Sequence, residues 1–148
     1  MKINATLVNT TIENVTENSN EVNVRCISKI NLTKIPGMDE EALDSILKAF
    51  PKVNYNDFLS ELIYYTEANA KCSPEDTYDK VLGQRIAESR AQSKAYNIAR
   101  RIYNIIMDNI ADKFYRVRQL LENSYNCEVH CFLHQAELGG IELEGIEE

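Results

Sequence analysis

A stretch of 47 residues, from about Asp79 to Tyr125, contains no proline and a single glycine, Gly83. Its apolar residues recur every three or four positions, which places them along one side of an α-helix. The later steps resemble a heptad repeat. The sequence therefore predicts one very long helix, whose inward positions we expect to be Leu82, Ile86, Ala91, Ala95, Ile98, Ile102, Ile105, Ile106, Ile110, Phe114, Val117 and Leu121.

A helix of this length raises a packing problem. At about 1.5 Å per residue it would extend roughly 70 Å, whereas a domain of this size has a radius of gyration of about 15 Å. Either the helix breaks near Asp108–Asn109, or it projects and packs against another subunit. The sustained apolar seam favours the second arrangement, a homo-oligomer with helix packing between subunits.

The N-terminal part of the chain predicts an antiparallel β-hairpin. The stretches Ile3–Ile12 and Glu21–Ile30 alternate apolar and polar residues, and a polar break over Thr16–Asn20 separates them. The alternation of the second stretch places four residues on one face, namely Val22, Val24, Cys26 and Ser28. A lone hairpin is marginally stable, so this face needs a cover.

Two short helices are expected next. Asp39–Phe50 has apolar residues at helical spacing, acidic residues at its start and Pro51 at its end. Tyr55–Ala70 is expected to be the second helix, with Phe58, Leu59, Leu62, Ile63 and Tyr65 available for packing. A loop follows, and Asp76 or Thr77 is expected to cap the long helix.

Beyond the long helix, alternate residues Cys127, Val129, Cys131 and Leu133 are apolar, which predicts a third strand that joins the hairpin. Residues 137–148 carry five Glu and no Lys or Arg, and we expect an acidic tail or an edge strand. The predicted fold class is α+β, with an N-terminal β-hairpin, a C-terminal strand, two short helices and one very long helix. Residues 1–136 are expected to form a single domain.

The charge of the chain is unevenly distributed. The formal net charge is -7, yet Lys80 to Arg118 holds nine Lys and Arg against three acidic residues. Guanidinium groups bind phosphate in a bidentate manner, and tyrosines among them can stack on nucleobases. The alternative interpretation is that these basic residues form a solvated helix face without a ligand. The candidate ligand-binding residues of this helix are Arg85, Arg90, Lys94, Tyr96, Arg100, Arg101 and Tyr103.

No motif of a catalytic site is found. The sequence has no G-x-S-x-G, no P-loop and no G-x-G-x-x-G, so we expect a protein that is not an enzyme and uses no cofactor. Cys127, His130, Cys131 and His134 are zinc-binding residue types, but on a strand the cysteines and histidines face opposite ways. We therefore expect buried structural cysteines and no metal. On a helix each like pair could meet, and a metalloenzyme that uses Cys127 to His134 is the alternative. No apolar run spans a membrane and no signal peptide is evident, so we expect a cytoplasmic protein.

A block from Ala70 to Asp79, followed by Gly83, Ile86-Ala87 and Arg90-Ala91, resembles a C-x-P-x-D-x-[FY]-D…G…I-A…R-A block of small bacteriophage proteins. Within that group the chain is similar to the first family of Thoeris anti-defence proteins. These are non-enzymatic sponges that sequester cyclic nucleotide signals in pockets formed between subunits. The block covers under a fifth of the chain, and the predicted helical segment Asp39–Ala70 departs from the family pattern.

This resemblance implies an anti-defence protein of a phage, acting in the cytoplasm of an infected or lysogenic bacterium. Its ligand would be a cyclic nucleotide or a similar small anion, held near the loop–helix junction by Asp76, Tyr78, Arg85 and Arg90. The alternative is an anti-CRISPR-type inhibitor that blocks a host defence nuclease. Its contacts would be acidic surfaces, namely residues 137–148 and Asp39-Glu40-Glu41.

Overall fold

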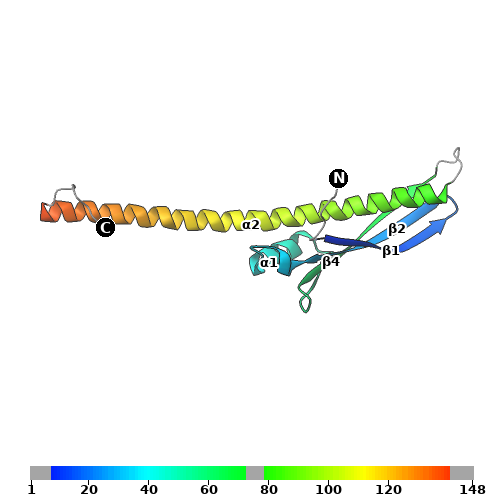
Figure 1. Ribbon diagram of the computed structural model, residues 1–148, viewed down its shortest axis with the longest axis horizontal. Coiled ribbons are helices and arrows are strands. Elements are labelled where there is room, and N and C mark those ends of the chain that lie inside the picture. The colour runs from blue at the N-terminus through cyan, green and yellow to red at the C-terminus, as the bar shows by residue number, and fades with distance from the viewer. Residues whose placement is uncertain (1–7, 73–78, 141–148) are drawn as a thin grey trace. The chain divides into compact units, whose positions relative to one another are not determined.

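The computed structural model describes residues 8–72 and 79–140 (Figure 1). The elements in chain order are β1 (Val8–Asn18), β2 (Glu21–Asn31), the 3₁₀ helix η1 (Leu32–Lys34), α1 (Glu40–Ala49), β3 (Asn54–Asn56), β4 (Glu61–Lys71) and α2 (Lys80–Gly139). The chain groups into two units, one up to Asn109 and one from Ile110 onward. The α+β class is confirmed, whereas a single domain over residues 1–136 stays a prediction.

The four strands form one antiparallel sheet in the order β1-β2-β4-β3. The predicted hairpin is confirmed as β1–β2, although the polar residues Thr16–Asn18 continue β1 and residues 3–7 lie outside the described residues. β2 pairs with β4 along its whole length, from Glu21–Lys71 to Asn31–Glu61. β3 pairs only with Glu61–Ile63. From Tyr64 onward, β4 therefore has a strand on one side only within the described part of the chain.

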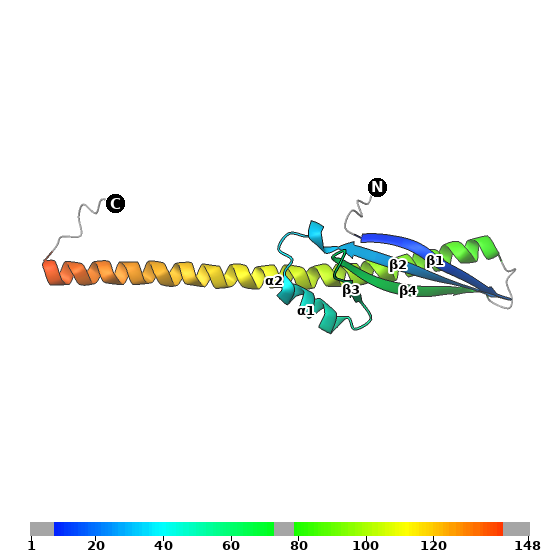
Figure 2. The same ribbon diagram turned by 90° about the horizontal axis from the view of Figure 1, so that it is seen from below.

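One face of this sheet forms the core of the first unit. The inward residues of β2 meet those of β4 in register, as the pairs Val22–Ala70, Val24–Ala68, Cys26–Thr66, Ser28–Tyr64 and Ile30–Leu62. All ten side chains are at most 9% exposed. The first part of α2 lies across this face (Figure 2). Burial raises the pKa of the Cys26 thiol, and the nearby Glu88 carboxylate adds to the effect.

Alanines allow α2 to approach the sheet closely. Ala87, Ala91, Ala95 and Ala99 recur every four residues and are at most 2% exposed. Their small side chains bring the helix backbone within reach of β4. The Tyr64 hydroxyl donates to the carbonyl oxygen of Ala95 at 2.7 Å, and the Thr66 hydroxyl donates to that of Ala91 at 2.9 Å. Burial raises the pKa of Tyr64 to about 12, so this hydroxyl remains a donor.

The predicted helix over Tyr55–Ala70 is wrong, because this segment forms β3, a turn and β4. The predicted helical spacing depended on Phe58 and Leu59 as packed residues, but they are 95% and 53% exposed in the turn. The buried positions alternate instead, from Leu62 to Ala70. Two of them are alanines, which have low strand propensity on their own. Their place in the strand is set by packing against the alanines of α2.

The predicted C-terminal strand is also wrong, since Cys127–Leu133 belongs to α2. Four alternating residues are a weak strand signal, whereas adding residues to an existing helix is favourable. No helix-breaking residue intervenes before Gly139-Gly140. Gly140 has a φ of 62°, the left-handed conformation that commonly ends helices. On this helix Cys127 and Cys131 are exposed, which corrects the expectation of buried cysteines.

The predicted helix over Asp39–Phe50 is confirmed as α1, with the Asp39 carboxylate accepting from the backbone N–H of Ala42 at 2.9 Å. The long helix is confirmed and extends to Gly139, without the break considered near Asp108–Asn109. Asp79 caps its start by accepting from the N–H of Leu82 at 3.1 Å, and the predicted caps Asp76 and Thr77 lie outside the described residues.

Several predicted inward positions of the long helix are exposed. Leu82 and Ile86 are 55% and 38% exposed, because the close approach to the sheet selects the alanine face of the helix. The later seam positions are exposed as well, namely Ile110, Phe114, Val117 and Leu121. Among the described residues, no helix combines the length and apolar character needed to cross a membrane.

Candidate functional site

Polar side chains form two rows across the outer face of the sheet, opposite the face that α2 covers. Each row takes one residue from β1, one from β2 and one from β4, aligned by the strand register. Residues in such cross-strand rows lie about 5 Å apart, so a single small molecule can contact several of them. The rows are Asn14–Arg25–Glu67 and Thr16–Asn23–Asn69.

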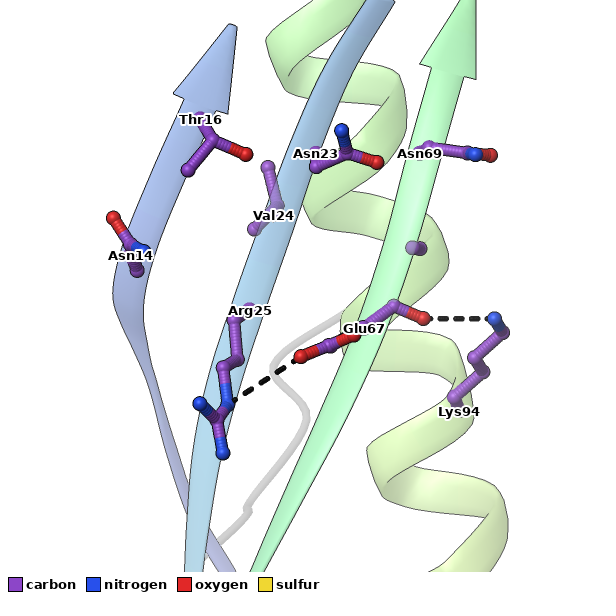
Figure 3. Close-up of a pocket in the computed structure, with 9 residues that line it drawn as sticks. Asn14, Thr16, Asn23, Val24, Arg25, Glu67, Asn69 and Lys94 are labelled. Atoms are coloured by element: carbon purple, nitrogen blue, oxygen red, sulfur yellow. Dashed lines mark hydrogen bonds and ion pairs between the residues drawn. The ribbon is translucent and has the colours of Figure 1, made fainter.

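A hollow of about 460 Å³ lies over these rows (Figure 3). This volume is within the range of small-molecule sites. Its lining adds Val24, Ala68 and Lys94 to the six row residues. Lys94 comes from α2 and reaches the site beside the open edge of β4, where its ammonium donates to the carbonyl oxygen of Glu67 at 2.8 Å. The site is therefore built by three strands and one helix.

A β-bulge aligns β1 with this site. The β1–β2 register shifts between Ile12 and Asn14, so that Glu13 is the extra residue. Before the bulge, odd-numbered residues of β1 face outward, and after it the even-numbered residues do. Asn14 and Thr16 consequently join the outer face, as bulges commonly re-aim side chains. Without the bulge, Val15 would occupy this polar surface.

Arg25 is the central cation of the hollow. Its Nε lies 3.3 Å from a carboxylate oxygen of Glu13 and 3.6 Å from one of Glu67. Its guanidinium carbon lies 4.3 Å from the centroid of the Tyr65 ring. These side chains are largely exposed, and exposed ion pairs contribute only about 0–1 kcal/mol. An anionic ligand can therefore compete for Arg25 at little cost.

The hollow also offers three amide side chains. Asn14, Asn23 and Asn69 each carry a donor NH₂ and an acceptor oxygen, and Asn69 donates to the Glu21 carboxylate at 2.7 Å. Amides pair with the mixed donor and acceptor edges of nucleobases. The lining contains no cysteine or histidine. The arrangement suits binding of a polar molecule through many hydrogen bonds.

Two of the basic residues that were predicted to bind the ligand contact the edge of β4. Arg90 donates to the carbonyl oxygen of Asn69 at 2.8 Å, one helical turn before the Lys94 contact with Glu67. They line a second, smaller hollow of about 320 Å³ with Ser93. Covering an open strand edge with long cationic side chains also protects it from pairing with other strands. Of these two basic residues, only Lys94 also lines the larger hollow.

The other residues that were predicted to bind the ligand lie apart from one another. The guanidinium of Arg101 lies 4.9 Å from the centroid of the Phe50 ring at the end of α1. The Tyr103 hydroxyl is buried and has no hydrogen-bond partner within the described residues, and burial raises its pKa to about 12. Arg85, Tyr96 and Arg100 are exposed on α2. Asp76 and Tyr78 lie outside the described residues, so the structure does not gather the predicted set in one pocket.

Most residues of the larger hollow were missed at the level of sequence. Asn23 and Arg25 alternate with the buried residues of a predicted strand, and that outward pattern is the signal that could have found them. Glu67 and Asn69 lie on the segment predicted to be helical. Asn14 and Thr16 depend on a bulge that no residue pattern marks.

The cysteine and histidine cluster lies in the second unit. Cys127 and Cys131, like His130 and His134, are four residues apart on α2 and therefore on the same side of the helix within each pair. Within residues 8–72 and 79–140, no group of three or more His, Cys, Asp or Glu side chains is arranged to hold a metal ion.

The acidic residues of the alternative function are partly used within the fold. The Asp39 carboxylate caps α1 and also accepts from the Asn109 amide at 3.1 Å. Glu40 and Glu41 form the first turn of α1, where negative charge is favourable. The acidic residues 141–148 lie outside the described residues.

No known protein family, no curated protein and no solved structure matches this chain.

Proposed function

We propose that this protein acts by binding, and that it sequesters a cyclic-nucleotide-like immune signal as a phage anti-defence protein. It would do so as a homo-oligomer in the cytoplasm of an infected bacterium. The observation that carries the binding proposal is the hollow of about 460 Å³ on the outer face of the sheet. Its three amides, one hydroxyl and two cations match the groups of a nucleotide.

Each class of side chain has a role in this proposal. Arg25 and Lys94 bind a phosphate oxygen, because charge-assisted hydrogen bonds are the stronger ones available. The amides of Asn14, Asn23 and Asn69 pair with base edges and ribose hydroxyls. Lys94 has donors left after its contact with Glu67, since an ammonium carries three.

The charge of the hollow narrows the class of ligand. Two cations line it together with Glu67, and Glu13 also pairs with Arg25. This nearly balanced lining disfavours a triphosphate, which brings several negative charges. It favours a compact ligand with one or two negative charges and many polar edges, such as a cyclic mononucleotide or cyclic dinucleotide.

Calorimetric titration with a panel of cyclic mononucleotides and dinucleotides tests this function. We expect saturable heat with at least one member and none with the matched linear triphosphate. Replacing Arg25 by Gln is expected to weaken binding roughly 10- to 100-fold, the value of a charge-assisted hydrogen bond. Absence of heat with every member would refute the proposal.

A matched variant locates the ligand. Arg85→Gln removes an exposed guanidinium of α2 that does not line the hollow. If the ligand occupies the hollow, this variant binds as the wild type does. Weaker binding in Arg85→Gln with unchanged binding in Arg25→Gln would instead place the ligand on the helix face that the sequence predicted.

A further inference from the structure

We infer that the second half of α2 binds a second copy of this chain in antiparallel orientation. The contact surface is an apolar seam of seven residues, Ile110, Phe114, Val117, Leu121, Tyr125, Val129 and Phe132. The inference rests on the homo-oligomer of the proposed function, and it is independent of the ligand. Its evidence lies in the second unit alone, from Ile110 onward.

The seam is continuous, and all of its residues are exposed except Phe132, which is half-buried. Its members follow one another at steps of three or four residues, so they form a stripe along the helix. Ile110, Leu121 and Phe132 are each 11 residues apart, a repeat that keeps a stripe nearly straight along an α-helix. Phe114, Leu121 and Tyr125 are 69%, 69% and 64% exposed.

The area of the seam suits a helix of similar length. The exposed apolar surface of the seam is on the order of 700 Å², close to the roughly 800 Å² per partner of a stable interface. An isolated helix of this kind is marginal in water unless its apolar face is covered. A second seam of the same length covers it along its whole extent.

The order of large and small residues favours an antiparallel pair. A two-fold axis at Leu121 places Ile110 opposite Phe132 and Val117 opposite Tyr125, and it brings Phe114 within one residue of the position opposite Val129. Each of these layers then combines an aromatic ring with an aliphatic side chain, which fills the interface evenly. A parallel pair would stack Phe114 on Phe114 and Val117 on Val117, which alternates crowded and underfilled layers.

The charges along the helix favour the same orientation. Residues 110–121 carry three basic residues and one acidic residue, whereas residues 122–140 carry three Glu and no Lys or Arg. An antiparallel pair sets the basic half of one copy against the acidic half of the other. The pairs Arg116–Asp112 and Arg118–Glu122 within each helix are exposed and weak, so they do not oppose this arrangement.

Sedimentation of the full chain without ligand tests the surface. We expect a mass of twice 16.9 kDa, or a higher even multiple, for the wild type. Phe114→Glu is expected to shift the mass to 16.9 kDa, while Tyr115→Glu, a neighbouring aromatic residue that is 59% exposed off the seam, leaves it unchanged. Circular dichroism at high concentration checks that both variants fold. A monomeric wild type, or a Phe114→Glu variant that still assembles, overturns the inference.

Disulfide crosslinking tests the orientation in a background where Cys72, Cys127 and Cys131 are replaced by Ser and the buried Cys26 is kept. Leu121→Cys, on the two-fold axis, should crosslink to itself. Val117→Cys should crosslink to Tyr125→Cys in a mixture but not to itself, because the two copies of residue 117 are about 12 Å apart along the axis. Self-crosslinking of Val117→Cys would show a parallel pair and overturn the antiparallel arrangement.

These measurements are separable from the proposed function. Assembly is measured without nucleotide, and ligand binding is measured by heat. A chain that dimerises and gives no heat supports the interface and refutes the ligand. A chain that binds nucleotide with measurable heat but remains a monomer supports the ligand and refutes the interface.

Discussion

The two halves of α2 carry different residues at their apolar positions. From Lys80 to Asn109 the buried face is mostly alanine, and Ala91 and Ala95 accept hydrogen bonds from the sheet through their backbone carbonyls. From Ile110 to Gly139 the apolar positions are mostly large and exposed. Small residues suit the close approach of a helix to a sheet, whereas large residues suit interdigitation with another helix. One continuous helix thus presents two interfaces, one covered by its own sheet and one exposed.

The largest expected contrast comes from the same substitution in each half. Ile102 is 0% exposed and Ile110 is 41% exposed. Ile102→Ala should lower the free energy of unfolding by about 2–5 kcal/mol, because it removes buried methyl groups and leaves a cavity. Ile110→Ala should cost less than about 1 kcal/mol at low protein concentration. Urea unfolding followed by circular dichroism measures both, and equal losses would contradict the division of the helix.

A second contrast adds volume instead of removing it. Ala91→Leu should cost about 1–3 kcal/mol, since this side chain is fully buried against β4 and the helix cannot move away without losing the Thr66 hydrogen bond. Ala111→Leu, at an exposed position, should change stability by less than about 0.5 kcal/mol. Thermal unfolding of the two variants side by side is the measurement. A tolerated Ala91→Leu would show that the helix does not need its alanines.

A smaller contrast separates two tyrosines of the first unit whose hydroxyl groups are buried. Tyr64→Phe removes the hydrogen bond to Ala95 and should cost about 1 kcal/mol. Tyr103→Phe removes a buried hydroxyl that has no partner among the described residues, so stability should be unchanged or slightly higher. Chemical unfolding at neutral pH measures both, and a loss in Tyr103→Phe equal to that in Tyr64→Phe would contradict this assignment.

The same tyrosines predict a loss of stability in alkali. Burial raises the pKa of each from 10.0 to about 12, so the folded state holds these protons while the unfolded chain releases them. Stability should therefore fall as the pH rises from 10 toward 12. Each Phe variant should lose less over this range than the wild type does. Unfolding curves across this pH range provide the test.

Sequence patterns were sufficient where one local signal decides the structure. The alternation of Val22, Val24 and Cys26 predicts β2, and Asp39 with Pro51 delimits α1. They failed for β4 because Ala68 and Ala70 become strand residues only by packing against the alanines of α2. They failed for Cys127–Leu133 because four alternating residues indicate a strand only weakly, whereas extending an existing helix is favourable.

The candidate site was harder to predict, since it depends on register. The hollow combines Asn14, Arg25 and Glu67, which come from three strands and meet through a bulge and two pairings. Residue types on the long helix indicated anion binding, but the structure uses Arg90 and Arg101 in contacts with β4 and Phe50. Charge alone therefore could not separate ligand contacts from contacts within the fold.

The division of α2 is tested most directly by hydrogen–deuterium exchange as a function of protein concentration. Amides of residues 80–109 are held by the sheet of the same chain, and their protection should not depend on concentration. Amides of residues 110–139 should gain protection as concentration rises, because assembly stabilises this half by mass action. Protection of residues 110–139 that is the same at every concentration would contradict the account.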